Sequence, residues 1–86
     1  MNLLSVEPMR DPRTPEILAW LDAMPLRKRI ETMHGMAFAL PRLKNDREWM
    51  DRINKAVAEL DPDPDEMTDI IVEAGRISGR LRRELG

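Results

Sequence analysis

Hydrophobic residues recur along this chain with the period of an α-helix, and prolines divide the pattern into separate segments. Within each segment, apolar side chains stand three or four residues apart, which places them on one helical face. Because proline removes a backbone hydrogen bond and clashes with the preceding turn, each segment between prolines should form its own helix. The four predicted apolar stripes are Ile17, Trp20, Leu21 and Met24; Leu26, Ile30, Met33, Ala37 and Leu40; Trp49, Met50, Ile53, Ala56, Val57 and Leu60; and Met67, Ile70, Ile71, Ala74, Ile77, Leu81 and Leu85.

Capping residues indicate where three of these helices begin. Thr14 precedes a proline, a combination that is favoured at the first positions of a helix. Asn45, with Glu48 three residues later, matches a capping box. Asp63 stands before a proline in the same way as Thr14. These residues predict helix starts that agree with the apolar pattern.

The last predicted helix contains two interior glycines, Gly75 and Gly79. Each destabilises a helix by about 1 kcal/mol relative to alanine. We therefore expect either a kink at these positions or the close approach of another helix. Gly35 in the second helix falls opposite the apolar stripe and weakens that prediction slightly.

The segments together predict an all-α protein, a small bundle of three main helices plus one short N-terminal helix. The expected helices cover approximately residues 14–24, 26–40, 46–60 and 64–85, in a single domain of residues 14–86 that follows an N-terminal arm of residues 1–13. A chain of 86 residues makes one small domain with a thin stability margin. Such a domain gains stability from a partner or from a second copy.

The charged residues are distributed unevenly, although the net charge is only −2. Residues 59–73 carry seven acidic side chains and no basic one, and residues 76–83 carry four arginines and no acid. A pI near 5.4 argues against broad, salt-dependent nucleic-acid binding as the main role. The first residues lack the pattern of a signal peptide, and no stretch is long enough to span a membrane. We therefore expect a cytoplasmic protein without membrane association.

Residues that most catalytic and metal sites need are scarce. With no cysteine and one histidine, the chain excludes disulfides, thiolate metal sites and any site that needs two imidazoles. Three aspartates between residues 61 and 65 alternate as in a calcium-binding loop, but Glu66 stands where such a loop needs glycine. Neither serine has a sequence signature that links it to His34. We expect no catalytic residue, no metal site and no cofactor, and hence a protein that is not an enzyme.

Arg27, Lys28 and Arg29 form a cationic cluster in the first turn of the second helix, where the helix dipole disfavours positive charge. Residues that break a local rule are more often functional than accidental. An acidic partner protein would compensate for the conflict. The chain's own acidic segment, residues 61–66, would do so as well, within the molecule or across a dimer. Both explanations are consistent with the sequence.

The second half of the same helix is apolar on all sides, from Met36 to Leu40. Phe38 lies off the apolar stripe, and His34 lies between Phe38 and the stripe. Phe38 therefore packs against another part of the chain or is exposed for a partner. Methionines such as Met36 adapt to irregular binding surfaces and to irregular cores alike.

These features lead us to expect a small, non-enzymatic protein-interaction module, such as an adaptor, a chaperone-like cofactor, a regulator or an inhibitor of a partner protein. Formation of a homodimer is also expected, because an all-round apolar segment gains from burial against a copy. The predicted contact surface on the second helix comprises Arg27, Lys28, Arg29, His34, Met36 and Phe38.

Two alternatives remain beside this hypothesis. The first is a regulator that contacts DNA or RNA through the cationic cluster and through the arginines of the last helix. These arginines are also stabilised simply by their position at a helix C-terminus. The four arginines are Arg76, Arg80, Arg82 and Arg83. The second alternative is a structural subunit of a larger assembly.

Overall fold

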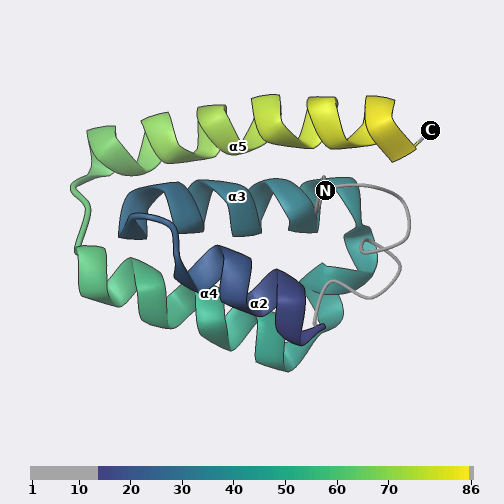
Figure 1. The fold of residues 1–86 in the computed structure, drawn as a ribbon. Coiled ribbons are helices and arrows are strands. Elements are labelled where there is room, and N and C mark those ends of the chain that lie inside the picture. Colours follow the sequence, from purple (N-terminus) through teal and green to yellow (C-terminus); the bar gives the residue numbers. More distant parts are fainter. Residues whose placement is uncertain (1–13, 86) are drawn as a thin grey trace.

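Four α-helices and one short 3-10 helix make up most of the computed structural model, which describes residues 14–85 (Figure 1). The α-helices are α2 (Pro15–Asp22), α3 (Leu26–Ala39), α4 (Arg47–Leu60) and α5 (Pro64–Leu85). The 3-10 helix η1 (Pro41–Asn45) connects α3 to α4. No strand occurs in the described residues, so the predicted all-α bundle with a short N-terminal helix is confirmed. The predicted arm, residues 1–13, lies outside the described residues.

Side-chain caps fix the start of three helices. Thr14 Oγ1 accepts a hydrogen bond of 3.4 Å from the backbone N–H three residues later, and Asp63 Oδ1 accepts one of 2.8 Å in the same way. Both caps were predicted. In α4 the cap is Asp46 and not Asn45, and its Oδ1 accepts at 2.9 Å. The prediction was wrong by one residue because Asn45 is the last residue of η1.

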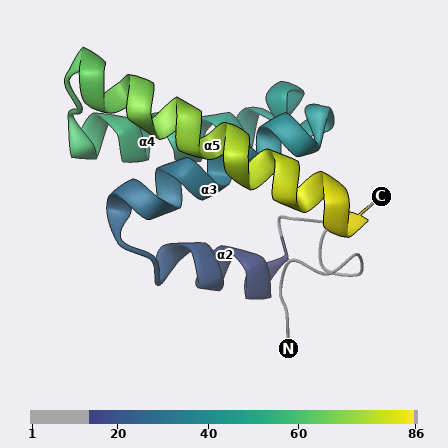
Figure 2. The same ribbon diagram turned by 90° about the horizontal axis from the view of Figure 1, so that it is seen from above.

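α3 is the central helix of the bundle (Figures 1 and 2). α5 runs along it in the same direction and contacts it at both ends. Near the start of α3, Arg27 Nη1 donates to Glu66 Oε2 of α5 at 3.3 Å. Near its end, the backbone carbonyl of Phe38 accepts from Arg82 Nη2 at 2.9 Å. The buried residues of α3 are Ile30, Glu31, Thr32, Met33, Gly35, Met36 and Ala37.

The core surrounds one fully buried tryptophan, Trp49 of α4. Its indole Nε1 donates a hydrogen bond of 3.4 Å to the backbone carbonyl of Met33 in α3. Because a buried indole N–H needs an acceptor, this bond favours one register between α3 and α4. The other buried members of this core cluster are Ile17, Leu21, Met33, Met36, Ala37, Leu43, Ile53, Ile77 and Leu81.

At Gly35, α3 and α5 lie too close together for a side chain to fit. A Cβ atom built on Gly35 would lie 2.7 Å from Ile77 Cγ2 and 3.0 Å from the backbone carbonyl oxygen of Ala74. The sequence placed Gly35 opposite the apolar stripe, where it weakened the predicted helix. That interpretation was wrong because α3 is packed on more than one side, and Gly35 belongs to the side that α5 covers.

α5 is one continuous helix through Gly75 and Gly79. Both residues are exposed, and a Cβ atom at either position would meet no atom within 4 Å. Within the described part of the molecule, no helix approaches them closely. The packing of the single chain therefore gives no reason for glycine at these two positions.

Replacing Gly35 with alanine tests the close packing of α3 against α5. We expect the free energy of unfolding to fall by about 1–3 kcal/mol, because the added methyl group must displace Ile77 or the backbone of α5. Urea denaturation of dilute protein, followed by tryptophan fluorescence, measures this loss.

Gly75→Ala is the matched control, since it adds the same methyl group to an exposed helical position. It should raise the free energy of unfolding by about 0.5–1 kcal/mol through better helix propensity. Equal stability of Gly35→Ala and the wild type would contradict the close contact between α3 and α5 at Gly35.

Candidate functional site

The six residues of the predicted contact surface do not form one continuous surface. Because other helices surround α3, only its first turn and one edge reach solvent. Met36 is buried; Arg29, His34 and Phe38 are partly buried; Arg27 and Lys28 are exposed.

Met36 belongs to the core, with 0% of its surface exposed. It packs in the same cluster as Trp49 and Leu81. A partner protein would reach Met36 only if α3 separated from its neighbours, so the expectation that Met36 contacts a partner was wrong. The all-round apolar character of this part of α3 reflects burial by several elements at once.

Arg29 stabilises the end of α2 and the turn that follows it by hydrogen bonds to their backbone. Its Nε donates to the carbonyl oxygen of Leu21 at 3.1 Å, and its Nη2 donates to those of Asp22 and Met24 at 3.2 and 3.3 Å. The last carbonyls of a helix have no partner within the helix and carry the negative end of its dipole. Arg29 therefore has a structural partner that compensates for its position in the first turn of α3.

Arg27 is held by carboxylates of α3 and α5. Its Nε donates to Glu31 Oε2 at 3.2 Å, and its Nη1 donates to Glu66 Oε2 at 3.3 Å. The hydrogen bond with Glu31, with the charges of Glu31, Glu66 and Asp69, raises the pKa of Arg27 above its usual value. Since Glu66 ends the acidic segment named above, the internal explanation of the cationic cluster holds for Arg27.

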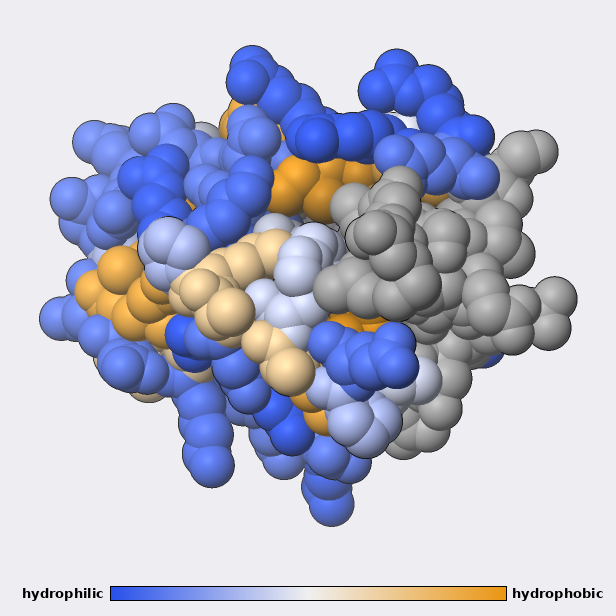
Figure 3. All heavy atoms as spheres, viewed as in Figure 1, coloured by the Kyte–Doolittle hydropathy of each residue, from blue (hydrophilic) through white to orange (hydrophobic). Residues whose placement is uncertain are grey.

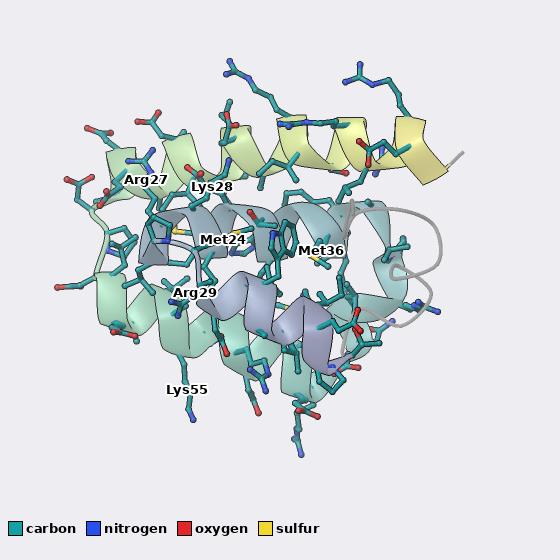
Figure 4. All side chains as sticks on the ribbon, in the orientation of Figure 1. Met24, Arg27, Lys28, Arg29, Met36 and Lys55 are labelled. Carbon is teal, nitrogen blue, oxygen red and sulfur yellow. The ribbon has the colours of Figure 1, made fainter. Side chains whose placement is uncertain are left out.

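Lys28 differs from its two neighbours in the cationic cluster. It is exposed, and it makes no ion pair with any residue that the structure describes. In Figure 4 the side chains of Arg27 and Lys28 extend toward α5, whereas that of Lys55 extends away from the molecule. Lys28 is thus the cation of this cluster that is available to a partner.

A small groove, called here the α2–α5 groove, opens beside Lys28 between α2 and α5. Its volume of about 130 Å³ is well below the roughly 300–1,000 Å³ of typical small-molecule pockets. This space suits a single apolar side chain. On the face seen in Figure 3, apolar side chains are visible between α5 and α2. The groove is lined by Trp20, Met24, Lys28, Thr32, Ile77, Arg80 and Leu81.

The α2–α5 groove has an apolar interior and a positively charged rim. Lys28 of α3 and Arg80 of α5 are both exposed, and neither makes an ion pair within the described residues. The Thr32 hydroxyl donates to the backbone carbonyl of Lys28 at 2.8 Å, so it has no further hydrogen to donate to a ligand. The groove therefore offers apolar contacts inside and two cations outside.

A second hollow, of about 220 Å³, lies between α2 and α4. Its charges are mixed: Arg52 and Lys55 face the same space as Asp22 and Glu59. Arg29 also lines it, but its guanidinium is bound to the carbonyls of α2. Because the charges partly cancel, this hollow has no single electrostatic preference.

His34 and Phe38 lie together at one edge of α3, with their ring centroids 6.1 Å apart. Lys44 Nζ of η1 lies 5.7 Å from the centroid of the Phe38 ring, within the range of a cation–π contact. Phe38 is partly buried. It is therefore neither a core residue nor a freely exposed one, and its contacts are with other parts of this chain.

Burial lowers the pKa of His34 below that of a free histidine, because the charged form loses its hydration. Its Nε2 is buried and has no hydrogen-bond partner within the described residues. A proton on this ring would thus be poorly stabilised in the folded chain.

The four arginines of α5 have different surroundings. Arg76 pairs with an acid three residues earlier at 3.5 Å, and Arg82 donates to a backbone carbonyl of α3. Arg80 and Arg83 are exposed and make no ion pair with a described residue. These four side chains therefore do not act as one unpaired basic surface.

Five groove residues were not predicted as site residues. Trp20 comes from α2, Met24 from the turn after it and Thr32 from α3, and the other two, Ile77 and Leu81, come from α5. The apolar ones followed helical stripes and were assigned to the core. No signal along the sequence shows that three helices bring them to one groove.

The described residues contain no cluster of three or more histidine or acidic side chains placed to hold a metal ion. None of the described helices is long and apolar enough to cross a membrane. The chain matches no protein-family model, no curated protein and no solved structure.

Arg29→Met tests the structural role of this arginine, since methionine keeps the apolar stem and removes the donors. We expect the free energy of unfolding to fall by about 1–2 kcal/mol, because two carbonyls of α2 and one of the turn that follows it lose a charged donor. The adjacent Lys28→Met should change it by less than about 0.5 kcal/mol. Thermal or urea denaturation compares them, and equal effects would contradict the assignment.

His34 should make stability depend on pH. The unfolded chain binds a proton near the ordinary pKa of 6.5, whereas the folded chain binds it only at lower pH. The free energy of unfolding should therefore fall as pH is lowered below 6.5. A His34→Leu variant should lose less stability between about pH 7.5 and 5.5. Identical pH dependence of the two proteins in urea titrations would show that His34 is not responsible.

Proposed function

We propose that this protein is a non-enzymatic interaction module that binds a segment of a partner protein in the α2–α5 groove. The segment inserts one large apolar side chain between Trp20 of α2, Met24 of the turn that follows α2, and the facing side of α5. Its acidic side chains lie against Lys28 and Arg80. An adaptor, a chaperone-like cofactor or an inhibitor would each use such a contact.

One observation carries this proposal: an apolar groove lies between two exposed cations without ion-pair partners in the described structure. Complementary charges at a rim speed association and disfavour partners of the same charge. In many interfaces a few buried anchor residues contribute most of the binding free energy. A groove that fits one side chain is suited to such an anchor. The expected ligand is therefore an acidic segment with a large apolar anchor.

The groove changes the part that the second predicted helix plays in binding. Of the six residues first expected to contact the partner, only Lys28 lines the groove, and Thr32 joins it one turn later. Met36 is buried, and the other four contact different parts of the chain. The expected acidic partner is thus recognised beside the start of α3 and not along its length.

The nucleic-acid alternative has weaker support from the charges of α5. Arg80 and Arg83 lack ion pairs within the described residues, but the exposed Asp65 and Asp69 precede them on the same helix. Binding to a phosphate backbone needs several cations along a continuous path. The charges of α5 therefore favour an acidic protein segment over nucleic acid as the ligand.

A random peptide library displayed on phage and selected against the full chain tests the proposal. Selected peptides should combine a large apolar residue with aspartate or glutamate. Their affinity for a Lys28→Glu/Arg80→Glu double variant should fall by about tenfold or more, since both attractions become repulsions. Lys55→Glu is the matched control, because Lys55 extends away from the groove (Figure 4), and it should leave the affinity unchanged. Fluorescence anisotropy with labelled peptides measures each affinity.

Selected peptides without acidic residues would contradict the proposal, as would equal binding to the wild type and the double variant. Circular dichroism establishes that the double variant is folded. Duplex DNA and single-stranded RNA are titrated in parallel. Binding to either that weakens steeply with salt, without enrichment of acidic peptides, would favour the nucleic-acid alternative instead.

A further inference from the structure

One side of α5 has no partner in the described molecule. In Figure 2, α5 lies in front of the other helices, and no described helix covers its outer side. The residues on this side stand three or four positions apart and share one helical face. They are Asp65, Thr68, Val72, Gly75, Gly79 and Arg83, all of them exposed, and they are called here the α5 outer face.

This face carries the most exposed large apolar side chain among the described residues. Val72 is 53% exposed, and its neighbour Ile71 is 38% exposed. The same face contains Gly75 and Gly79, and a Cβ atom built on either glycine would have no atom within 4 Å. A helix packed here would bury the two aliphatic side chains and would fit against the glycines, where the backbone is uncovered.

The charges at the two ends of the α5 outer face are opposite. Asp65 lies in the first turn of α5 and Arg83 in the last. The surrounding charges follow the same order, with seven acids and no base in residues 59–73 and four arginines and no acid in residues 76–83. A second α5 would therefore meet like charges if it were parallel and opposite charges if it were antiparallel.

We propose that the α5 outer face binds the same face of a second copy of this chain, in an antiparallel pair with twofold symmetry. When two copies of this face are placed antiparallel, each charged or large residue of one copy meets an oppositely charged or small residue of the other. In that register Asp65 lies opposite Arg83, Thr68 opposite Gly79, and Val72 opposite Gly75 of the other copy. Each contact occurs twice, as twofold symmetry requires.

The pairs of a side chain with a glycine let the two helices approach closely. Interaxial distances between packed helices depend on the side chains at the contact, and glycine permits short ones. Val72 of each copy then covers the backbone at Gly75 of the other. This arrangement gives the interior glycines of α5 a function that the single chain does not.

The dimer and the proposed partner site use different residues of α5. The groove is lined by Ile77, Arg80 and Leu81, none of which belongs to the α5 outer face. Self-association therefore leaves both grooves of the pair open. Failure of one proposal would leave the other intact.

Sedimentation equilibrium of the full chain over a range of concentrations tests this dimer. The wild type should show a reversible monomer–dimer equilibrium. Gly75→Gln should weaken dimerisation by about tenfold or more, because a long side chain in both copies keeps the helices apart. Glutamine is a better helix former than glycine, and the position is open, so the monomer should remain folded. Ala58→Gln, at an exposed position of α4, is the matched control and should change nothing.

A charge exchange tests the antiparallel register. Asp65→Arg and Arg83→Asp should each weaken dimerisation by about tenfold, because each places like charges opposite one another twice in the pair. The double variant should recover most of the lost affinity, since opposite charges face each other again. Circular dichroism establishes the helicity of every variant.

A wild-type chain that stays monomeric at every concentration would overturn the proposal. A dimer that is insensitive to Gly75→Gln would also overturn it. Failure of the double variant to recover would exclude the antiparallel register. If Gly75→Gln does not fold, the charge exchange alone decides between these outcomes.

Discussion

The contact between α3 and α5 at Gly35 is the constraint on which the rest of this structure depends. With no side chain at Gly35, the backbone of α3 lies against Ile77 and the carbonyl of Ala74. The bonds of Arg27 to Glu66 and of Arg82 to the carbonyl of α3 hold the two ends of the same pair. This arrangement turns Arg80 toward the groove beside α2 and leaves Val72 on the outside. Both proposed surfaces therefore follow from how one helix lies on another.

The helices could be predicted from sequence because their signals are local. Thr14 and Asp63 cap the residues that directly follow them, and prolines separate the segments. Features that depend on neighbouring elements were missed. Asn45 has a good capping signal, but it is the last residue of η1, and Asp46 caps α4 instead. The packing role of Gly35 was missed as well. A single apolar stripe does not reveal that a helix is covered on two sides, and Gly35 lies on the second side.

The candidate site was predictable only in part, for a related reason. The cationic cluster was rightly identified as a local conflict, but its three members resolve it differently. Arg29 binds carbonyls of the preceding helix, Arg27 binds carboxylates, and Lys28 has no ion pair within the described residues. Lys28 and Arg80 belonged to two separate candidate sites in the sequence. Only the packing of α5 on α3 places them on the rim of one groove.

The most direct test of this account is a proton NMR experiment on the contact at Gly35. We expect strong nuclear Overhauser effects between the Gly35 Hα protons and the γ2 methyl group of Ile77, because a Cβ atom at Gly35 would lie 2.7 Å from that methyl carbon. Absence of these effects in a folded chain, with Gly35 instead close to residues of α4, would contradict the arrangement from which both surfaces are derived.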